Sequence, residues 1–294
     1  MATIGTTEEY NNSFEVVTAG AWASGGNLNT ARNNLAGCGT QTLGLAFGGY
    51  VDPNAKDETE EYDGSTWSEQ NNLTTARQNL GGLGTQTAAL AFGGYTTTKV
   101  DNSEEYDGTS WTEGNDLNTT RDQSGGAGTQ TAGLAFGGQL PGNAMSNATE
   151  EYDGTNWTSG NNMGTGRRLF ADAGIQTAAL GAGGYIDGTG NQTATEEYDG
   201  TNWTSGGALS TTRHALAGCG TQTAALAFAG NPSTATTEGY DGSSWSTRPS
   251  MATARYRLAG AGTQTSGLAI GGFVSDVTNA TEEFTGEVAT ETAS

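Results

Sequence analysis

The chain has 294 residues, a formal net charge of −21 at pH 7 and only two lysines, Lys56 and Lys99. This charge would repel a nucleic-acid backbone or an anionic membrane surface, so neither is an expected partner. The amino terminus has no basic segment or apolar run, and no stretch reaches the roughly 18–20 apolar residues that span a bilayer, so we expect neither a secretion signal nor membrane insertion.

Six tryptophans recur at nearly even intervals, and the same residues follow each of them at fixed distances. The tryptophans are Trp22, Trp67, Trp111, Trp157, Trp203 and Trp245. An arginine follows ten residues later in every copy: Arg32, Arg77, Arg121, Arg167, Arg213 and Arg255. A glutamine follows nine residues after the arginine, and a glycine pair seven residues after that, with Ala229-Gly230 as the one variant. The chain is therefore one unit of 42–46 residues repeated six times.

Each repeat continues, after its arginine, with two short runs of small and apolar residues. In the second repeat, Asn-Leu-Gly-Gly-Leu-Gly and Ala-Ala-Leu-Ala-Phe-Gly-Gly flank Thr85-Gln86-Thr87. The runs are too short for helices and are bounded by glycines, which favours two buried β-strands, here called A and B, joined by a hairpin. Small residues suit strands that converge on an axis, because only Gly or Ala permits a close approach of backbones.

The second half of each repeat predicts another hairpin. A loop of variable length leads to an acidic pair and an aromatic residue, as in Glu104-Glu105-Tyr106, and then to Asp107-Gly108 and Trp111. Asp-Gly between two short aromatic-bearing runs indicates a hairpin with a type I′ turn, which needs a positive φ at both central residues. These runs are the predicted strands C and D.

Six tandem sheets of four short antiparallel strands, each too small to fold alone, predict an all-β fold, a six-bladed β-propeller. The chain begins within a blade, so we expect the ring to close by pairing of the amino- and carboxyl-terminal segments. Trp22 would then supply the outer strand of the last blade, which removes an open sheet edge. We assign residues 1–294 to this single propeller, with 1–13 and 286–294 as terminal extensions or tethers.

The third strand of the last blade has more than one candidate. Residues 14–17 and 281–284 compete for the same place, and residues 7–10 are a third copy of the same motif. The segments left over could form an extra edge strand, reach a neighbouring subunit or tether the propeller to a larger assembly.

The glycine pair that ends strand B, a tyrosine about a dozen residues on and a tryptophan five residues after it resemble the Kelch motif. Six such repeats cover nearly the whole chain. The resemblance implies a six-bladed propeller with its A strands innermost. It is specific for architecture and not for activity, because Kelch propellers serve many roles.

The repeat arginines and the acidic pairs each have two interpretations. A ring of guanidinium groups near the axis could bind a carboxylate or phosphate, or each arginine could pair with a repeat glutamate or with backbone carbonyls. We favour the structural pairing, because a binding site requires asymmetry whereas a scaffold requires repetition. Neighbouring glutamates on a strand point to opposite faces, so we expect one of each pair to meet an arginine and the other to face solvent.

The cysteine and histidine content excludes several chemistries. Cys38 and Cys219 occupy the same position in repeats one and five, too far apart around the ring for the ~5.5–6 Å Cα spacing of a disulfide, so we expect two buried thiols. The only histidine, His214, cannot form a copper or zinc site by itself. The sequence has no phosphate-binding loop, nucleophile elbow or Cys-His constellation, so we expect no cofactor, no metal and no enzymatic activity.

Departures from the repeat identify a candidate site. Repeats four to six carry bulky, charged or aromatic residues at the starts of their A strands, which share one end of the propeller. The candidate ligand-binding residues are Arg167, Arg168, Phe170, Asp172, Arg213, His214, Arg255, Tyr256 and Arg257. A basic and aromatic groove of this kind can bind an anionic or neutral sugar by stacking and bidentate hydrogen bonds. Sequence drift near loops would produce the same pattern.

The particular residues of the repeats also resemble a narrower group of Kelch-type proteins. Segments such as Ala-Thr-Glu-Glu-Tyr-Asp-Gly-Thr-Asn-Trp and Leu-Ala-Gly-Cys-Gly-Thr-Gln-Thr-Ala look like Kelch-type repeats in structural proteins of marine bacteriophages. That resemblance implies a non-enzymatic virion component, such as a fibre, a tail appendage or a capsid decoration. It would be made in the host cytoplasm, would contact other virion proteins or copies of itself, and would bind host-surface glycans.

Two other functions stay open at this point. A glycan-active enzyme of the sialidase or oxidase type would need catalytic residues that the sequence does not show, and loss of activity on mutating Arg168 or Arg257 would support it. A cytoplasmic Kelch adaptor would bind a partner protein through its variable loops, and capture of such a partner would support that function.

Overall fold

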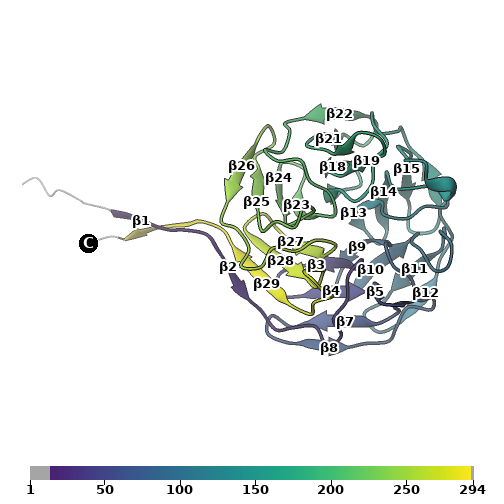
Figure 1. The fold of residues 1–294 in the computed structure, drawn as a ribbon, viewed down its shortest axis with the longest axis horizontal. Coiled ribbons are helices and arrows are strands. Elements are labelled where there is room, and N and C mark those ends of the chain that lie inside the picture. The colour runs from purple at the N-terminus through teal and green to yellow at the C-terminus, as the bar shows by residue number, and fades with distance from the viewer. Residues whose placement is uncertain (1–13, 293–294) are drawn as a thin grey trace, which may run out of the picture.

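Six four-stranded antiparallel sheets surround a central axis in the computed structural model, which describes residues 14–292 (Figure 1). The protein is therefore an all-β, six-bladed propeller, as the repeats predicted. Within the described residues the only helix is the three-residue 3-10 turn η1 (Pro141–Asn143), so none there is long and apolar enough to cross a membrane.

The strands of each blade follow the order A, B, C, D from the axis outward. Blade 1 contains β3 (Ala36–Gly39), β4 (Gly44–Phe47), β7 (Thr59–Tyr62) and β8 (Trp67–Glu69). Blade 2 contains β9 (Gly81–Thr85), β10 (Ala88–Phe92), β11 (Ser103–Tyr106) and β12 (Trp111–Glu113). Blade 3 contains β13 (Gly125–Thr129), β14 (Ala132–Phe136), β15 (Thr149–Tyr152) and β16 (Trp157–Ser159).

The second half of the ring repeats this plan. Blade 4 contains β17 (Ala171–Ile175), β18 (Ala178–Ala182), β21 (Thr195–Tyr198) and β22 (Trp203–Gly206). Blade 5 contains β23 (Ala217–Thr221), β24 (Ala224–Phe228), β25 (Thr237–Tyr240) and β26 (Trp245–Arg248). Two short hairpins, β5 (Tyr50–Val51) with β6 (Asn54–Ala55) and β19 (Tyr185–Ile186) with β20 (Gly190–Asn191), extend the B–C loops of blades 1 and 4.

Blade 6 closes the ring with strands from both ends of the chain. It contains β27 (Ala259–Gly262), β28 (Ser266–Ile270), β29 (Thr281–Thr285) and, as its outer strand, β2 (Ala21–Ser24). Trp22 pairs with Phe284 in this closure, so the predicted pairing is confirmed and β29 fills the contested third strand. The competing segment, β1 (Phe14–Thr18), pairs with β30 (Val288–Thr292) in a two-stranded stalk that projects from the disc (Figure 1). Residues 7–10 lie outside the described residues.

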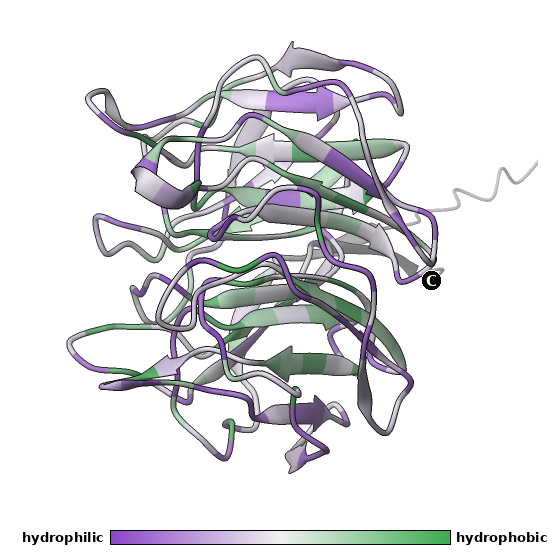
Figure 2. Ribbon diagram, turned by 90° about the vertical axis from the view of Figure 1, so that its right-hand side faces the viewer, coloured by the Kyte–Doolittle hydropathy of each residue, from purple (hydrophilic) through white to green (hydrophobic). Residues whose placement is uncertain are grey.

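The A strands line the axis, and each contacts the A strands of both neighbouring blades. Their small residues allow this convergence: a Cβ atom added at Gly218 on β23 would lie 2.5 Å from the backbone oxygen of Asp172 on β17. The most hydrophobic strands lie inside the disc, and hydrophilic segments lie along its edges and turns (Figure 2). Cys38 and Cys219 are buried free thiols, as predicted, and burial raises the pKa of each to about 12.

The Asp-Gly turns form hairpins, but not of the predicted type I′. In blade 1, only Gly64 has a positive φ, +88°, and the loop between strands C and D has four residues. The Asp63 carboxylate accepts hydrogen bonds from the backbone amides of Ser65 and Thr66, at 2.8 and 2.7 Å. The aspartate side chain thus replaces the second positive-φ residue by satisfying the turn amides directly.

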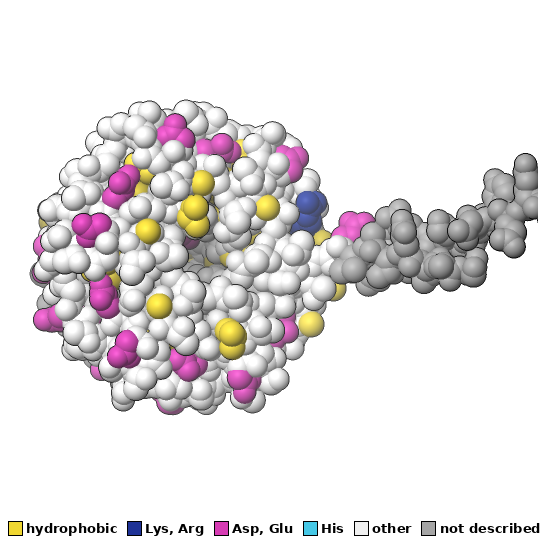
Figure 3. Space-filling model, turned by 180° about the vertical axis from the view of Figure 1, so that it is seen from behind, with side chains coloured by type: hydrophobic (Ala, Val, Ile, Leu, Met, Phe, Trp, Pro, Cys, Tyr) yellow, Lys and Arg dark blue, Asp and Glu magenta, His cyan; other side chains and the backbone are white. Residues whose placement is uncertain are grey.

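The two ends of the disc carry different parts of each repeat. The A–B and C–D turns share one end, where Gly64 packs against Thr42; we call this the hairpin face. The B–C loops and the connections that enter each A strand share the other end, the loop face. On the side of the disc opposite to the viewer of Figure 1, acidic side chains spread around the ring and basic ones reach only the margin (Figure 3).

Side chains at three positions of the repeat bond each blade to the preceding one, two of them in all six blades and the third in five. Each repeat tryptophan donates its indole N–H to a Thr or Ser hydroxyl at the start of the preceding blade's strand C, at 2.9–3.0 Å. The amide of each repeat glutamine donates to two backbone carbonyls of the preceding blade, as Gln86 does to Gly44 and Tyr62. The repeated residues are therefore mainly interblade contacts, and they hold every blade in the same orientation.

The third interblade contact joins a tyrosine to the second glutamate of the preceding blade. Tyr106 donates its hydroxyl to Glu61 at 3.0 Å, and the equivalent bond recurs between four other pairs of blades. These glutamates were expected to face solvent; instead they are partly buried acceptors. The sixth pair has no such bond, because Gly239 replaces the glutamate and Phe284 replaces the tyrosine.

Removal of residues 1–24 tests the closure of the ring. The deletion removes β2 together with Trp22, whose ring lies 5.1 Å from that of Phe228 and 5.2 Å from that of Phe284. Losing a packed tryptophan costs about 3–5 kcal/mol, and 1 kcal/mol shifts Tm by roughly 2–4 °C in domains of about 200 residues. We expect calorimetry to show Tm lower by about 10 °C or more. Deletion of residues 1–18, which keeps β2, is the control, and equal melting of both proteins would contradict the closure.

The missing sixth tyrosine–glutamate bond can be restored by Gly239→Glu with Phe284→Tyr. Each single change buries an unpartnered polar group, whereas the double change pairs them, so the two effects on unfolding free energy should not add. The side chain nearest to Gly239 is the flexible Arg248, which can move aside. A double-mutant cycle in urea should give a favourable coupling of about 1–2 kcal/mol, typical of a hydrogen bond to a charged group. Strict additivity would show that the bond contributes nothing.

Candidate functional site

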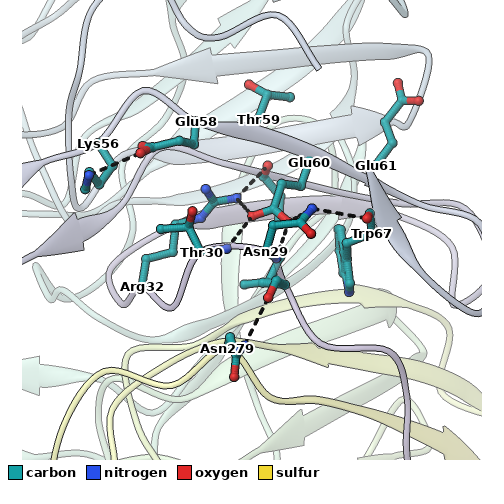
Figure 4. Close-up of polar contacts among 12 residues, drawn as sticks. Asn29, Thr30, Arg32, Lys56, Glu58, Thr59, Glu60, Glu61, Trp67 and Asn279 are labelled. Carbon is teal, nitrogen blue, oxygen red and sulfur yellow. Dashed lines mark hydrogen bonds and ion pairs between the residues drawn. The ribbon is translucent and has the colours of Figure 1, made fainter. Parts of the chain in front are cut away.

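The repeat arginines form six buried ion pairs and are not accessible to a ligand. Each is at most 1% exposed and contacts the first glutamate of strand C in its own blade. The pairs are Arg32–Glu60, Arg77–Glu104, Arg121–Glu150, Arg167–Glu196, Arg213–Glu238 and Arg255–Glu282. Arg32 and Asn29 converge on Glu60, whereas Glu61 points away from them (Figure 4). The structural interpretation of the arginines is therefore confirmed.

Four of the nine predicted site residues do not reach a surface. Arg167, Arg213 and Arg255 are members of the buried ion pairs. Phe170 is 6% exposed and stacks on Phe136, with ring centroids 5.4 Å apart. Their burial reflects the tertiary packing of neighbouring blades, which a single repeat does not reveal.

The residue that follows each repeat arginine lies on the loop face, and here the blades differ. These residues are Asn33, Gln78, Asp122, Arg168, His214 and Tyr256. An isolated β-bridge joins each of the six to the residue after the glycine pair of its own repeat, as in Arg168 with Tyr185 and Tyr256 with Phe273. In repeat five the pair is the variant Ala229-Gly230. The bridges fix the backbones of both residues, so the side chains project from equivalent places in every blade.

Arg168 is the centre of a polar and aromatic cluster. Its guanidinium lies over the Tyr185 ring, 5.2 Å from the centroid, and donates to the amide oxygen of Gln123 at 3.0 Å. Asp187 lies 3.6 Å away, but its side chain is 52% exposed, so this ion pair is weak. The guanidinium side chain is 22% exposed and is held in place by Tyr185 and Gln123. It is therefore positioned for a ligand by contacts that leave part of it accessible.

His214 lies beside Arg168. Its ring centroid is 5.2 Å from that of Tyr185, and its Nδ1 lies 2.8 Å from the Asn191 side-chain oxygen, to which it donates. Burial lowers the pKa of His214, and the positive charges of Arg168 and Arg257 lower it further. Blades 4, 5 and 6 thus bring Arg168, His214 and Arg257 within electrostatic reach of one another, with the imidazole neutral at pH 7.

Arg257 completes this cluster from blade 6. Its guanidinium lies 5.8 Å from the centroid of Tyr256, whose ring packs against Phe273. Its side chain forms no ion pair or hydrogen bond with the residues that the structure describes. We call Arg168, Tyr185, His214, Tyr256 and Arg257 the loop-face cluster. Sequence comparison of the repeats identified four of these residues but missed Tyr185.

A closed ring of backbone hydrogen bonds surrounds the axis at the loop face. Six residues with φ between 52° and 57°, one per blade, each donate an amide N–H to the carbonyl of the preceding member at 2.7–3.1 Å. They are Asn34, Asn79, Gln123, Leu169, Ala215 and Arg257, and we call them the axial ring. Below the ring lies a cavity of about 120 Å³, and below that one of about 170 Å³; Asp172 lines both.

Tyr185 could have been found by aligning the repeats at the glycine pair. The next residues are Tyr50, Tyr95, Gln139, Tyr185, Asn231 and Phe273, and their variety marks the same asymmetric face. A second group missed by the sequence is Lys99 with Asp122, 3.7 Å apart and nearly buried. Burial raises the pKa of Asp122 to about 6, although Lys99 and Arg168 oppose this shift.

Fold and site define the protein as a six-bladed β-propeller whose repeated charges are buried and whose unrepeated basic and aromatic side chains gather on one face. Within the described residues, no group of three or more His, Cys, Asp or Glu side chains is arranged to hold a metal ion. In comparisons with known proteins, no protein-family model and no curated protein matches this chain.

The half-buried carboxylate of Asp172, which lines the axial cavity, should make stability depend on pH. Burial raises its pKa from 3.8 to about 6, against the hydrogen bond from the Gly126 amide. The folded state therefore binds the proton more tightly than the unfolded state, so this contribution is present below pH 4 and is lost as pH rises through about 6. Relative to Asp172→Asn, the parent should lose on the order of 2 kcal/mol between pH 4 and 7. Parallel pH profiles of unfolding free energy would contradict this expectation.

Proposed function

We propose that this protein is a non-enzymatic structural and binding module that displays the loop-face cluster to a glycan. The observation that carries the proposal is the division of its charges. The repeat arginines and the first glutamates of the acidic pairs form buried ion pairs with each other. Arg168 and Arg257, in contrast, remain accessible beside aromatic rings. A scaffold that neutralises its repeated charges and keeps two unrepeated ones on one face suits recognition better than catalysis.

The chemistry of the cluster favours a sugar that carries a carboxylate. A guanidinium presents its N–H groups in a planar fork that matches a carboxylate, and Tyr185 and Tyr256 provide aromatic surface of the kind that packs against a pyranose ring. The neutral imidazole of His214 offers a hydrogen bond without adding charge. The overall charge of −21 opposes binding of a polyanion, so a ligand with a single carboxylate fits better than a sulfated polymer.

The resemblance to Kelch-type repeats of marine phages supports a virion component, in which the propeller would be carried on a fibre, a tail appendage or the capsid surface. The stalk suits this arrangement, because β1 and β30 leave the disc together from blade 6. Other virion proteins or further copies of this chain would then hold the stalk, while the loop face meets the host surface. Detection of the chain in purified virus particles by mass spectrometry tests this part of the proposal.

A glycan array that includes uronic and sialic acids tests the binding site. Arg168→Gln and Arg257→Asn replace each arginine with a residue found at the same position in another repeat, Gln78 or Asn34, so both should fold normally. We expect saturable binding to carboxylated glycans that weakens at least about tenfold in each variant, as loss of a charged hydrogen bond predicts.

Lys56→Gln is the control, because it removes one positive charge from a B–C loop of blade 1 that holds no member of the cluster and where Lys56 pairs with Glu58. Binding that falls equally in the control would indicate a general charge effect. An array with no binding at all would remove the glycan-recognition part of the proposal and leave the structural part to the particle experiment.

A further inference from the structure

The cavity below the axial ring contains two charges that break the six-fold repeat. Arg257 belongs to the ring at the mouth of the cavity, where the other blades have Asn, Gln, Leu or Ala. Asp172 lies deeper, where the five other blades have glycine: Gly37, Gly82, Gly126, Gly218 and Gly260. Two residues of opposite charge therefore line one space whose other lining residues are neutral.

Asp172 is not one of the repeated interblade contacts, and its only hydrogen bond to another blade within the described residues comes from the Gly126 amide. One carboxylate oxygen accepts a hydrogen bond from the Gly126 amide at 2.5 Å, and the carboxylate has no ion pair within the described part of the chain. Removing a carboxylate from water without a cation is unfavourable, and glycine serves at the same position in every other blade. A residue that destabilises the fold and departs from the repeat indicates a functional requirement at that position.

Apolar side chains form part of the wall between Asp172 and Arg257, beside polar groups of other lining residues. Leu35, Leu80, Leu216 and Leu258 line the cavity just below the axial ring, and each is buried. The ring itself is closed by six backbone hydrogen bonds with one residue per blade, so the positions of its members are fixed.

We propose that the axial cavity binds a slender zwitterion of the ω-amino carboxylate type, with its carboxylate at Arg257, its methylene groups against the leucines and its ammonium at Asp172. From the axial ring to the level of Asp172 is three residues along an A strand, roughly 10 Å at ~3.3 Å per residue. A chain of several methylene groups spans this distance. The ammonium would supply the cation that the Asp172 carboxylate lacks.

The two charges also select against simpler ligands. A monoamine would pass Arg257 without a negative group to meet it, and a monocarboxylate would place an apolar end against the Asp172 carboxylate. Only a molecule that carries both groups at opposite ends satisfies both residues. The axial site is separate from the loop-face cluster, although Arg257 lies at the boundary of the two.

Isothermal titration with 6-aminohexanoate, hexanoate and hexylamine tests the proposal on the full chain. We expect 6-aminohexanoate to bind at least about tenfold more tightly than either compound with one charged group. Asp172→Gly restores the residue of the five other blades, and Arg257→Asn restores that of Asn34 and Asn79, so neither change should prevent folding. Each should weaken 6-aminohexanoate binding at least about tenfold.

Three results would overturn the axial site: no heat with 6-aminohexanoate at millimolar concentration, equal affinity for hexanoate, or unchanged affinity in Asp172→Gly. Asp172→Asn, which keeps an acceptor for the Gly126 amide, shows whether the loss follows the charge and not the side-chain volume; full affinity in this variant would also overturn the proposal. Arg168→Gln should leave 6-aminohexanoate binding unchanged while it weakens glycan binding, so failure of one site is distinguishable from failure of the other.

Discussion

The buried arginine–glutamate pair is the interaction on which the rest of the structure depends. In each blade it joins the residue that enters strand A to the start of strand C, and the same glutamate accepts a backbone amide from the incoming connection, as Glu60 does from Asn29. Removing one member of a buried ion pair strongly destabilises the folded state, because the other charge is left buried without a partner. The pair therefore fixes where every A strand begins, and with it the axial ring and the loop face.

Around this pair, the other repeated side chains act between blades and not within them. A four-stranded blade is too small to bury its own faces, so tryptophan, glutamine and tyrosine each reach the preceding blade. Glu238-Gly239 and Phe284 show how specific this is: where the acceptor glutamate is absent, the donor hydroxyl is absent as well. The two substitutions lie in different repeats and leave no buried polar group unpaired.

Both proposed binding sites lie where repetition fails. Arg168, His214 and Arg257 share no partner in the buried network. The bridges at the loop face nevertheless fix the backbones of Arg168 and His214, and the axial ring fixes that of Arg257, as they do for the neutral equivalents in other blades. Asp172 also departs from the repeat, because it places a charge where the five other blades have glycine. The scaffold thus provides fixed positions, and single substitutions on it create chemistry without disturbing the fold.

The repeat pattern alone predicts six units with four strands in each and ring closure through Trp22, and it favours a structural role for the arginines over a ligand site. Periodicity carries this information because every copy must satisfy the same contacts. Packing between blades, in contrast, buries Phe170 and three of the predicted arginines, selects β29 over β1 for blade 6, adds Tyr185 to the cluster and places Asp172 in the same cavity as Arg257. These depend on neighbouring blades, and contacts between residues some 40 positions apart are not encoded in the pattern of any one repeat.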